Sequence, residues 1–247
     1  MEINFLELWA RMGFPVRAVV IVLTLQAMAC VTVIIDRLVV LFQSAAKARS
    51  FAELVQPALE HRQYNEALSL ANEVKGSHLA LYLSLGLRTF TTRMHAGDAV
   101  SRAAELARRA LERKGDAISR DLNRGMNVLA STGSTAPFVG LLGTVLGIIN
   151  AFKLIAAEGS GGIGTIGAAI GEALVVTGYG LVVAIPSVLI FNYLSGKIAA
   201  YEAGLINAGS ELLDQLEIAA QDEPNGLSTN SAHPELSGGT ATASALG

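Results

Sequence analysis

Residues 171–186 read GEALVVTGYGLVVAIP and contain one carboxylate, Glu172, inside a long run of uncharged residues. From Gly159 to Gly196 no other residue carries a charge. At about 1.5 Å of rise per residue, a helix of that length spans more than the ~30 Å hydrocarbon core of a bilayer. The stretch therefore predicts a membrane-spanning helix that holds a single acid among several glycines and a proline.

The composition of the whole chain points to the same class of protein. The chain has 247 residues, of which 51% are hydrophobic and 16% charged, and its mean hydropathy is +0.46. This is too apolar for an ordinary soluble domain and predicts a protein that crosses a membrane several times. The net charge of −3 and the lack of a strong basic patch argue against a nucleic-acid partner.

The sequence offers no recognisable enzyme chemistry. It contains no Walker loop, nucleophile elbow or metal-ligand spacing. Its one cysteine, Cys30, allows neither an intrachain disulfide nor a zinc-like cluster. We therefore expect a protein that is not an enzyme and uses no cofactor or metal.

Three apolar segments are long enough to span a bilayer. They cover residues 16–42, 127–155 and 164–197, and the first lacks a small-residue cleavage site, so it is predicted to be an uncleaved anchor. Backbone polar groups in lipid must pair within their own segment, so each span should be a helix. The predicted fold is an all-α polytopic membrane protein with three transmembrane helices and long helical cytoplasmic extensions.

Charge in the connecting segments predicts the orientation. The insert at residues 43–126 is rich in Lys and Arg, whereas the short link KLIAAEGSGGIG around residues 156–163 has Lys153 and Glu158 as its only charges. The positive-inside rule places the insert in the cytoplasm and the link outside. Residues 1–15 then form a short outer N-terminus, and the C-terminus is cytoplasmic.

The insert is expected to be helical. Apolar residues recur at helical spacing in its first half, and Asp98 is a plausible N-cap for its second half. Favourable pairs four residues apart support that second helix: Asp98–Arg102, Glu105–Arg109 and Asp116–Arg120. Because no proline lies between Asp98 and the second span, the helix is predicted to run unbroken into the membrane.

The chain after the third span divides into two parts. Residues 198–221 have the pattern of an amphipathic helix that projects below the membrane. Residues 222–247 contain few large apolar side chains, so we expect a disordered tail there.

Glycines recur at helical spacing in the second and third spans. Small residues on one face let another helix backbone approach closely, either within one subunit or between subunits. The glycines singled out for helix packing are Gly140, Gly143, Gly147, Gly167 and Gly171.

Polar side chains inside these spans have two interpretations each. Thr144 and Thr177 can bond back to a carbonyl of their own helix, or they can take part in function. Glu172 can be an interfacial or structural acid, or it can face a bundle interior or wet cavity, as intramembrane acids usually do. Tyr179 follows Glu172 by seven residues and therefore shares its helix face.

Two runs in these spans carry a family resemblance. The segments TAPFVGLLGTVLGIINAF at residues 135–152 and GEALVVTGYGLVVAIPSVLIFN at residues 171–192 resemble the motifs of the MotA/TolQ/ExbB proton-channel family, in its TolQ/ExbB branch. The layout of three spans with a large insert is also similar. The resemblance implies a stator subunit of a bacterial inner-membrane motor that forms a homo-oligomeric ring, generally a pentamer.

The resemblance also implies partners and residue roles. An ExbD/TolR-like single-span subunit with a membrane aspartate would occupy the ring, in membrane lipid, and a TonB/TolA-like or motility force transducer would receive the force. Thr144 and Thr177 match lumen-lining threonines, and Glu172 matches the glutamate of the third span. Pro137 and Pro186 match the motif prolines, where kinks are expected.

One position departs from the family pattern. Gly178 and Tyr179 stand where a small and then an aliphatic residue are usual. The phenol can form a hydrogen bond in or beside the conduction path, or it can pack at a subunit seam. This departure leaves room for a gliding-motility motor beside outer-membrane import and envelope constriction.

Two functions from other classes remain open at this point. One is a transporter or receptor that binds a cationic ligand at Glu172. The other is a structural scaffold without an ion path.

Overall fold

The structure is a computed structural model that describes residues 9, 12–61, 63–74, 76–158 and 163–222. The predicted tail beyond Asp222, most of the outer N-terminus and half of the link at 156–163 lie outside the described residues. Every regular element in the described part of the chain is a helix, which confirms the predicted all-α class.

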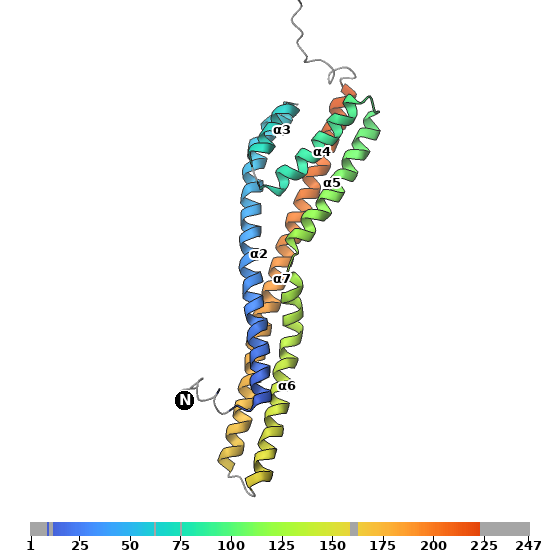
Figure 1. Cartoon of the computed structure of the whole chain (residues 1–247). Helices are drawn as coiled ribbons and strands as arrows, with labels where there is room; N and C mark the ends of the chain where they lie inside the picture. The colour runs from blue at the N-terminus through green and yellow to red at the C-terminus, as the bar shows by residue number, and fades with distance from the viewer. Residues whose placement is uncertain (1–8, 10–11, 62, 75, 159–162, 223–247) are drawn as a thin grey trace, which may run out of the picture.

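The described helices fall into two groups. They are α2 (Phe14–Glu60), α3 (Tyr64–Glu73), α4 (His78–His95), α5 (Val100–Leu122), α6 (Met126–Glu158) and α7 (Ile163–Asp222). Figure 1 shows α2, α6 and α7 side by side at one end of the molecule, while α3, α4 and α5 pack beside α2 and α7 at the other. We call α3, α4, α5 and the parts of α2 and α7 that contact them the distal bundle.

Three of these helices are long and apolar enough to cross a membrane. The stretches Phe14–Leu59, Met126–Lys153 and Gly167–Gln221 contain windows with mean hydropathies of 2.6, 1.7 and 2.3. This confirms the three predicted spans. Helix α2 extends over 47 residues and α7 over 60, so both continue without a break from the membrane into the distal bundle.

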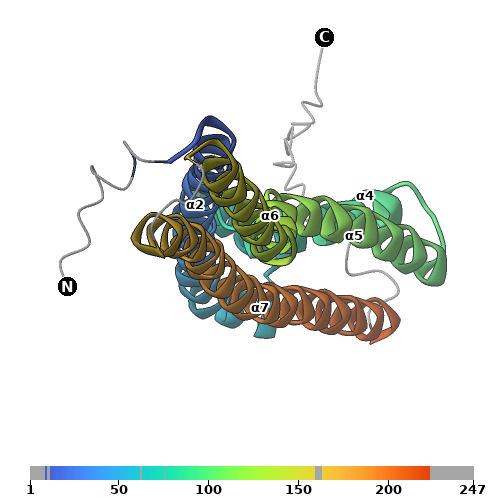
Figure 2. The same cartoon turned by 90° about the horizontal axis from the view of Figure 1, so that it is seen from below.

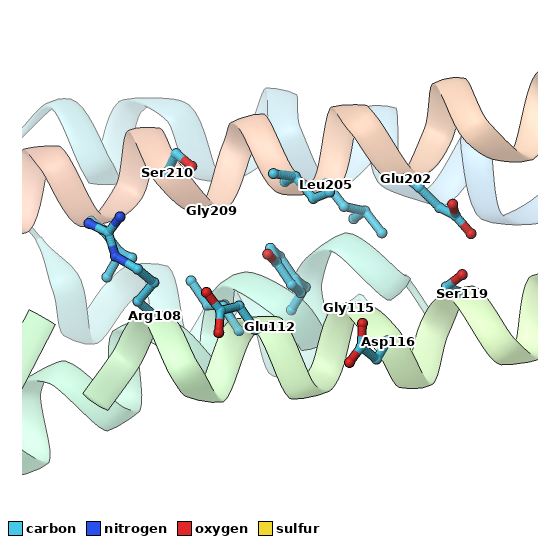
Figure 3. Close-up of a pocket in the computed structure, with 13 residues that line it drawn as sticks. Arg108, Glu112, Gly115, Asp116, Ser119, Glu202, Leu205, Gly209 and Ser210 are labelled. Atoms are coloured by element: carbon cyan, nitrogen blue, oxygen red, sulfur yellow. The ribbon is translucent and has the colours of Figure 1, made fainter. Parts of the chain in front are cut away.

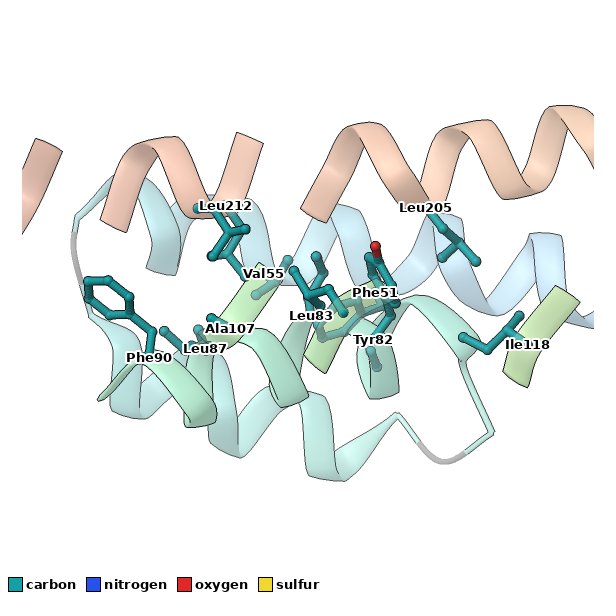
Figure 4. Close-up of a cluster of buried hydrophobic side chains, with 14 of the residues drawn as sticks. Phe51, Val55, Tyr82, Leu83, Leu87, Phe90, Ala107, Ile118, Leu205 and Leu212 are labelled. Carbon is teal, nitrogen blue, oxygen red and sulfur yellow. The ribbon is translucent and has the colours of Figure 1, made fainter. Parts of the chain in front are cut away.

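The distal bundle has a hydrophobic core of its own. Phe51 of α2 and Phe90 of α4 are each 1% exposed, and Ala107 of α5 and Leu212 of α7 belong to the same cluster (Figure 4). Burial of one such large side chain contributes about 1.5–3 kcal/mol to folding. The distal bundle is therefore held together by side-chain packing.

The membrane end has a smaller core and a large apolar outer surface. Leu23 of α2, Ala136 of α6 and Val176 of α7 are at most 1% exposed. Phe138 and Val182, in contrast, are 72% and 67% exposed in the single chain. The view from below in Figure 2 shows α2, α6 and α7 grouped together, with α4 and α5 offset to one side. Apolar surface of this extent is suited to lipid or to another subunit.

A groove separates α5 from α7 in the distal bundle. It has a volume of about 350 Å³, and Figure 3 shows Arg108 and Ser210 toward one end and Ser119 and Glu202 toward the other. Tyr82 of α4 lines this groove and packs closely on Gly209 of α7. A Cβ added to Gly209 would lie 2.6 Å from the Tyr82 ring. Burial and the nearby Glu112 raise the pKa of Tyr82, so this phenol stays neutral.

The predicted unbroken helix from Asp98 into the membrane is wrong. Helix α5 ends at Leu122 and α6 begins at Met126. Gly125 in the turn has a φ of +80°, in the left-handed region that glycine adopts without strain. A glycine can therefore end a helix without any proline.

The predicted N-cap of α5 is also wrong. Helix α5 begins at Val100, and its N-cap is Ala99, which has no side-chain cap hydrogen bond. Asp98 instead lies 3.7 Å from Arg102 and 3.9 Å from Arg93 of α4. Its carboxylate therefore pairs with arginines of two helices and does not cap backbone N–H groups.

The turn at Gly125 yields a testable prediction. We expect Gly125→Ala to lower the free energy of unfolding by at least about 1–2 kcal/mol, the strain of a left-handed alanine. The new Cβ would also lie 3.3 Å from the Val33 side chain. Thermal unfolding of the detergent-solubilised protein, followed by circular dichroism, measures the loss.

Gly97→Ala is the matched control for this prediction. Its φ is +81°, but a Cβ there meets nothing within 4 Å, so only backbone strain is added. Gly125→Ala should be the more damaging substitution of the two. Wild-type stability of Gly125→Ala would contradict this account of the turn.

Candidate functional site

The backbones of α6 and α7 touch along a seam of small residues. A Cβ added to Gly140 would lie 3.1 Å from Thr177 Cα, and one added to Gly180 would lie 2.7 Å from the carbonyl oxygen of Ala136. The distance at Gly180 is too short for any Cβ, and the one at Gly140 would require the α7 backbone to shift by a few tenths of an ångström. The two helices can approach this closely only because glycine stands at these positions.

Two further glycines of α6 extend the seam. A Cβ added to Gly143 would lie 2.5 Å from Val176 Cγ1, and one added to Gly147 would lie 2.6 Å from Ala173 Cβ. The stripe of Gly140, Gly143 and Gly147 therefore packs on α7 of the same chain.

The glycines predicted for packing on α7 have a different environment. A Cβ added to Gly167 or Gly171 would meet no described atom within 4 Å, and the same is true of Gly178. All three residues are exposed in the single chain. Their role in helix packing stays a prediction, and within the described residues it has no partner helix.

The two threonines make different hydrogen bonds. Thr177 Oγ1 donates to the carbonyl oxygen of Gly140 on α6, at 2.8 Å, and so links the two helices. Thr144 Oγ1 donates to the carbonyl of Leu141 in its own helix, at 2.7 Å. Both side chains are half-buried. Each hydroxyl has committed its one hydrogen to a carbonyl, so only its lone pairs remain available.

Tyr179 faces α2. Its hydroxyl lies 3.2 Å from Thr24 Oγ1, and Thr24 Oγ1 itself donates to the Val20 carbonyl at 2.8 Å. Because the Thr24 hydrogen is committed, Tyr179 is the donor in this pair. The phenol therefore links α7 to α2 within one chain, a contact that sequence reasoning did not consider.

Glu172 lies half-buried on α7, between exposed Gly171 and buried Ala173. Ala173 is the residue that packs against Gly147 of α6. Glu172 is thus fixed one residue away from the α6–α7 seam. Whether it lines a proton path stays a prediction.

Both motif prolines lie inside helices that continue on either side. Pro137 is in α6 and Pro186 is in α7. Proline removes one backbone hydrogen bond from a helix and usually bends it. The predicted kinks at these residues stay a prediction.

Polar contacts of α2 were missed by the sequence analysis. Gln26 Nε2 donates to Thr135 Oγ1 of α6 at 3.3 Å. Gln26 and Thr24 were detectable as polar residues in an apolar span, but their partners lie more than 100 positions away in the chain.

A buried arginine joins α2 to the end of α5. Arg37 is 6% exposed, and its guanidinium donates to the carbonyl oxygens of Asp121 at 2.6 Å and Leu122 at 3.4 Å. It also forms an ion pair with the neighbouring Asp36. The last carbonyls of a helix lack backbone partners and carry partial negative charge, so a cation stabilises them. The sequence analysis assigned no role to Arg37.

The chain resembles known membrane proteins over its central and C-terminal helices. Residues 79–205, just over half of the chain, match the family described as the MotA/TolQ/ExbB proton channel family. The chain belongs to this family. The match runs from α4 into α7, so it includes the α6–α7 seam, whereas Thr24, Gln26 and Arg37 of α2 lie outside it. The family is one of proton channels and not of enzymes.

Relatives support the ExbB/TolQ branch. Biopolymer transport protein ExbB of Pseudomonas putida is 46% identical over 103 residues, which are 42% of this chain and 31% of the relative. ExbB of Xanthomonas campestris pv. campestris (strain B100) is 48% identical over 99 residues, 40% of this chain and 39% of the relative. ExbB of Salmonella typhimurium is 42% identical over 103 residues, 42% of each chain. The aligned stretch thus spans less than half of each relative.

The seam predicts different outcomes for Gly143, which lies in it, and for Gly171, which does not. Gly143→Leu should destabilise the chain by about 1–3 kcal/mol, because overpacking forces α6 away from Val176. Gly171→Leu should leave the stability of the chain unchanged, since nothing lies within 4 Å of its Cβ position. Thermal unfolding in detergent measures both effects.

Native mass spectrometry of the same variants distinguishes helix packing within one chain from packing between subunits. If Gly171 packs between subunits, Gly171→Leu will lower the oligomer mass while the chain stays folded. Equal stability of Gly143→Leu and wild type would contradict the close seam.

Proposed function

We propose that this chain is the ring-forming stator subunit of a motor driven by the proton-motive force in a bacterial inner membrane. The observation that carries the proposal is the placement of Glu172. It is the one charged residue between Gly159 and Gly196, and it is half-buried beside the tightly packed α6–α7 seam. Intramembrane acids of this kind mark ion pathways, and the family is one of proton channels.

The threonines suit a proton path as acceptors. Thr144 and Thr177 have each committed their hydrogen to a carbonyl, so their free lone pairs can accept from a hydrated proton or from a protonated carboxyl. In this scheme the titrating group is the membrane aspartate of an ExbD/TolR-like partner. Glu172 stays in the ring wall, where it supports hydration and packing.

The ring itself rests on surface that a single chain leaves uncovered. The glycine stripe of Gly167, Gly171 and Gly178 faces no described atom, and large apolar side chains such as Phe138 are exposed. Small residues and apolar surface are what transmembrane helix association uses. We propose a homo-oligomer, a pentamer by family resemblance, with the partner helices in its centre.

The orientation and the load complete the proposal. The basic insert is placed in the cytoplasm by the positive-inside rule, so the N-terminus is outside and the C-terminus inside. The relatives are named biopolymer transport proteins, which favours a TonB-like force transducer over a motility load. The Tyr179 hydroxyl contacts Thr24 of α2 within the same chain.

Proton flux into proteoliposomes tests the proposal. The chain alone, under a pH gradient, should take up few protons, because it lacks the mobile acid. Addition of an ExbD/TolR-like subunit should start the flux. Robust uptake by the isolated chain would contradict the two-subunit scheme.

Two substitutions of Glu172 define its role in the reconstituted complex. Glu172→Gln keeps the size and hydrogen bonding, so we expect flux to persist. Glu172→Ala removes both, so we expect flux and assembly to fall. Loss of flux with intact assembly in both variants would instead make Glu172 a titrating group, and wild-type flux in Glu172→Ala would remove it from the path.

The threonines can be tested by isosteric replacement. Thr144→Val and Thr177→Val should each reduce flux strongly in assembled complexes, since valine cannot accept a hydrogen bond. Thr177→Val should also destabilise the chain by about 0.6 kcal/mol, the average for an interhelical membrane hydrogen bond. Thr144→Val should not, because its bond lies within one helix. Full flux in the double variant would return both threonines to a structural role.

A further inference from the structure

His78 lies where four helices of the distal bundle meet. It is the first residue of α4, and its Nε2 atom lies 3.9 Å from the Asp121 carboxylate at the end of α5. Its ring makes an edge contact with Tyr201 of α7, with ring centroids 6.3 Å apart. Lys47 of α2 and Lys114 of α5 are near enough to act on its charge.

Two buried polar atoms at this junction have no hydrogen-bond partner. They are Nδ1 of His78 and the hydroxyl oxygen of Tyr201. A neutral imidazole can leave Nδ1 as an unprotonated acceptor, but an imidazolium must donate from both nitrogens. The described residues supply a carboxylate on the Nε2 side only, so the site is built for the neutral form of His78.

The local electrostatics act in the same direction. Burial lowers the pKa of His78 below 6.5, Lys114 and Lys47 lower it further, and Asp121 opposes them. The Asp121 carboxylate is 57% exposed, so solvent weakens its attraction. His78 also stands at the N-terminus of α4, where the helix dipole disfavours a cation.

The residue that faces His78 also holds the joint to the membrane helices. The backbone carbonyl of Asp121 accepts the hydrogen bond from Arg37 of α2. Four residues later Gly125 makes the turn from which α6 enters the membrane. A displacement of the Asp121 end of α5 would therefore alter the Arg37 contact and the start of α6.

We propose that His78 is a proton-binding site that controls this joint. When His78 is neutral, α4, α5 and α7 pack around its ring, and we call this arrangement the closed joint. When His78 takes up a proton, the end of α5 separates from these helices, which gives the open joint. With the orientation proposed above, the site responds to acid in the compartment that incoming protons enter. That last clause rests on the proposed function, whereas the response of the joint to pH does not.

The direction of the pH effect follows from linkage. Well above pH 6.5 His78 is neutral both in the closed joint and in the open one, so the joint keeps its full stability. As pH falls below 6.5, the open form takes up a proton before the closed form does. The equilibrium therefore shifts toward the open form, by at most about tenfold per pH unit for one proton.

Hydrogen–deuterium exchange of the full-length protein tests the proposal. Amides in the first turns of α4 and the last turns of α5 should exchange faster as pH falls from 7.5 to 5.5, after correction for the intrinsic pH dependence. His78→Gln should abolish this acceleration. His95→Gln is the matched control, because His95 lies on the same helix, is exposed, and has its Nδ1 2.7 Å from the Thr91 carbonyl oxygen of that helix.

Two variants of neighbouring charges keep the test decisive if His78→Gln folds poorly. Asp121→Asn removes the attraction that raises the pKa of His78, so the acceleration should continue to lower pH than in wild type. Lys114→Gln removes a positive charge that lowers the pKa of His78, so the acceleration should end at higher pH than in wild type. Acceleration that persists in His78→Gln, or that is unmoved by both charge variants, would overturn the proposal. Neither outcome depends on whether the protein conducts protons.

Discussion

The membrane region depends on one contact, the direct approach of the α6 and α7 backbones at Gly140 and Gly180. No side chain separates the helices there, so the Thr177 hydroxyl reaches the Gly140 carbonyl and bonds it at 2.8 Å. A hydrogen bond between helices is stable in an apolar medium, where neither group has water as an alternative.

The membrane helices are connected to the distal bundle in two ways. Helices α2 and α7 pass from one to the other without a break, whereas the chain from α5 to α6 turns at Gly125. The turn is held by Arg37, which donates hydrogen bonds to the carbonyls of Asp121 and Leu122 at the end of α5. It is therefore the point at which a small local change can alter the direction of α6, and His78 lies beside it.

Much of the fold was accessible from sequence, but the helix ends were less so. Three spans followed from apolar length, and the glycine stripe of α6 followed from its spacing. The absence of a proline suggested one helix from Asp98 into the membrane, but Gly125 adopts a left-handed conformation and ends it. Asp98 had the right residue type for a cap, yet arginines of α4 and α5 compete for its carboxylate.

The sequence by itself determined the class and the number of spans, because hydropathy and backbone pairing in lipid act locally along the chain. It also determined the family, because the two motifs in the second and third spans are continuous in the chain. Only the tertiary structure decided which partner each polar group has. Thr177 bonds across to α6 while Thr144 bonds within its own helix, and Tyr179 meets Thr24 of α2. These choices depend on the register between helices that are distant in the chain. Single hydrogen bonds worth about 1 kcal/mol separate the alternatives, and no local pattern encodes that register.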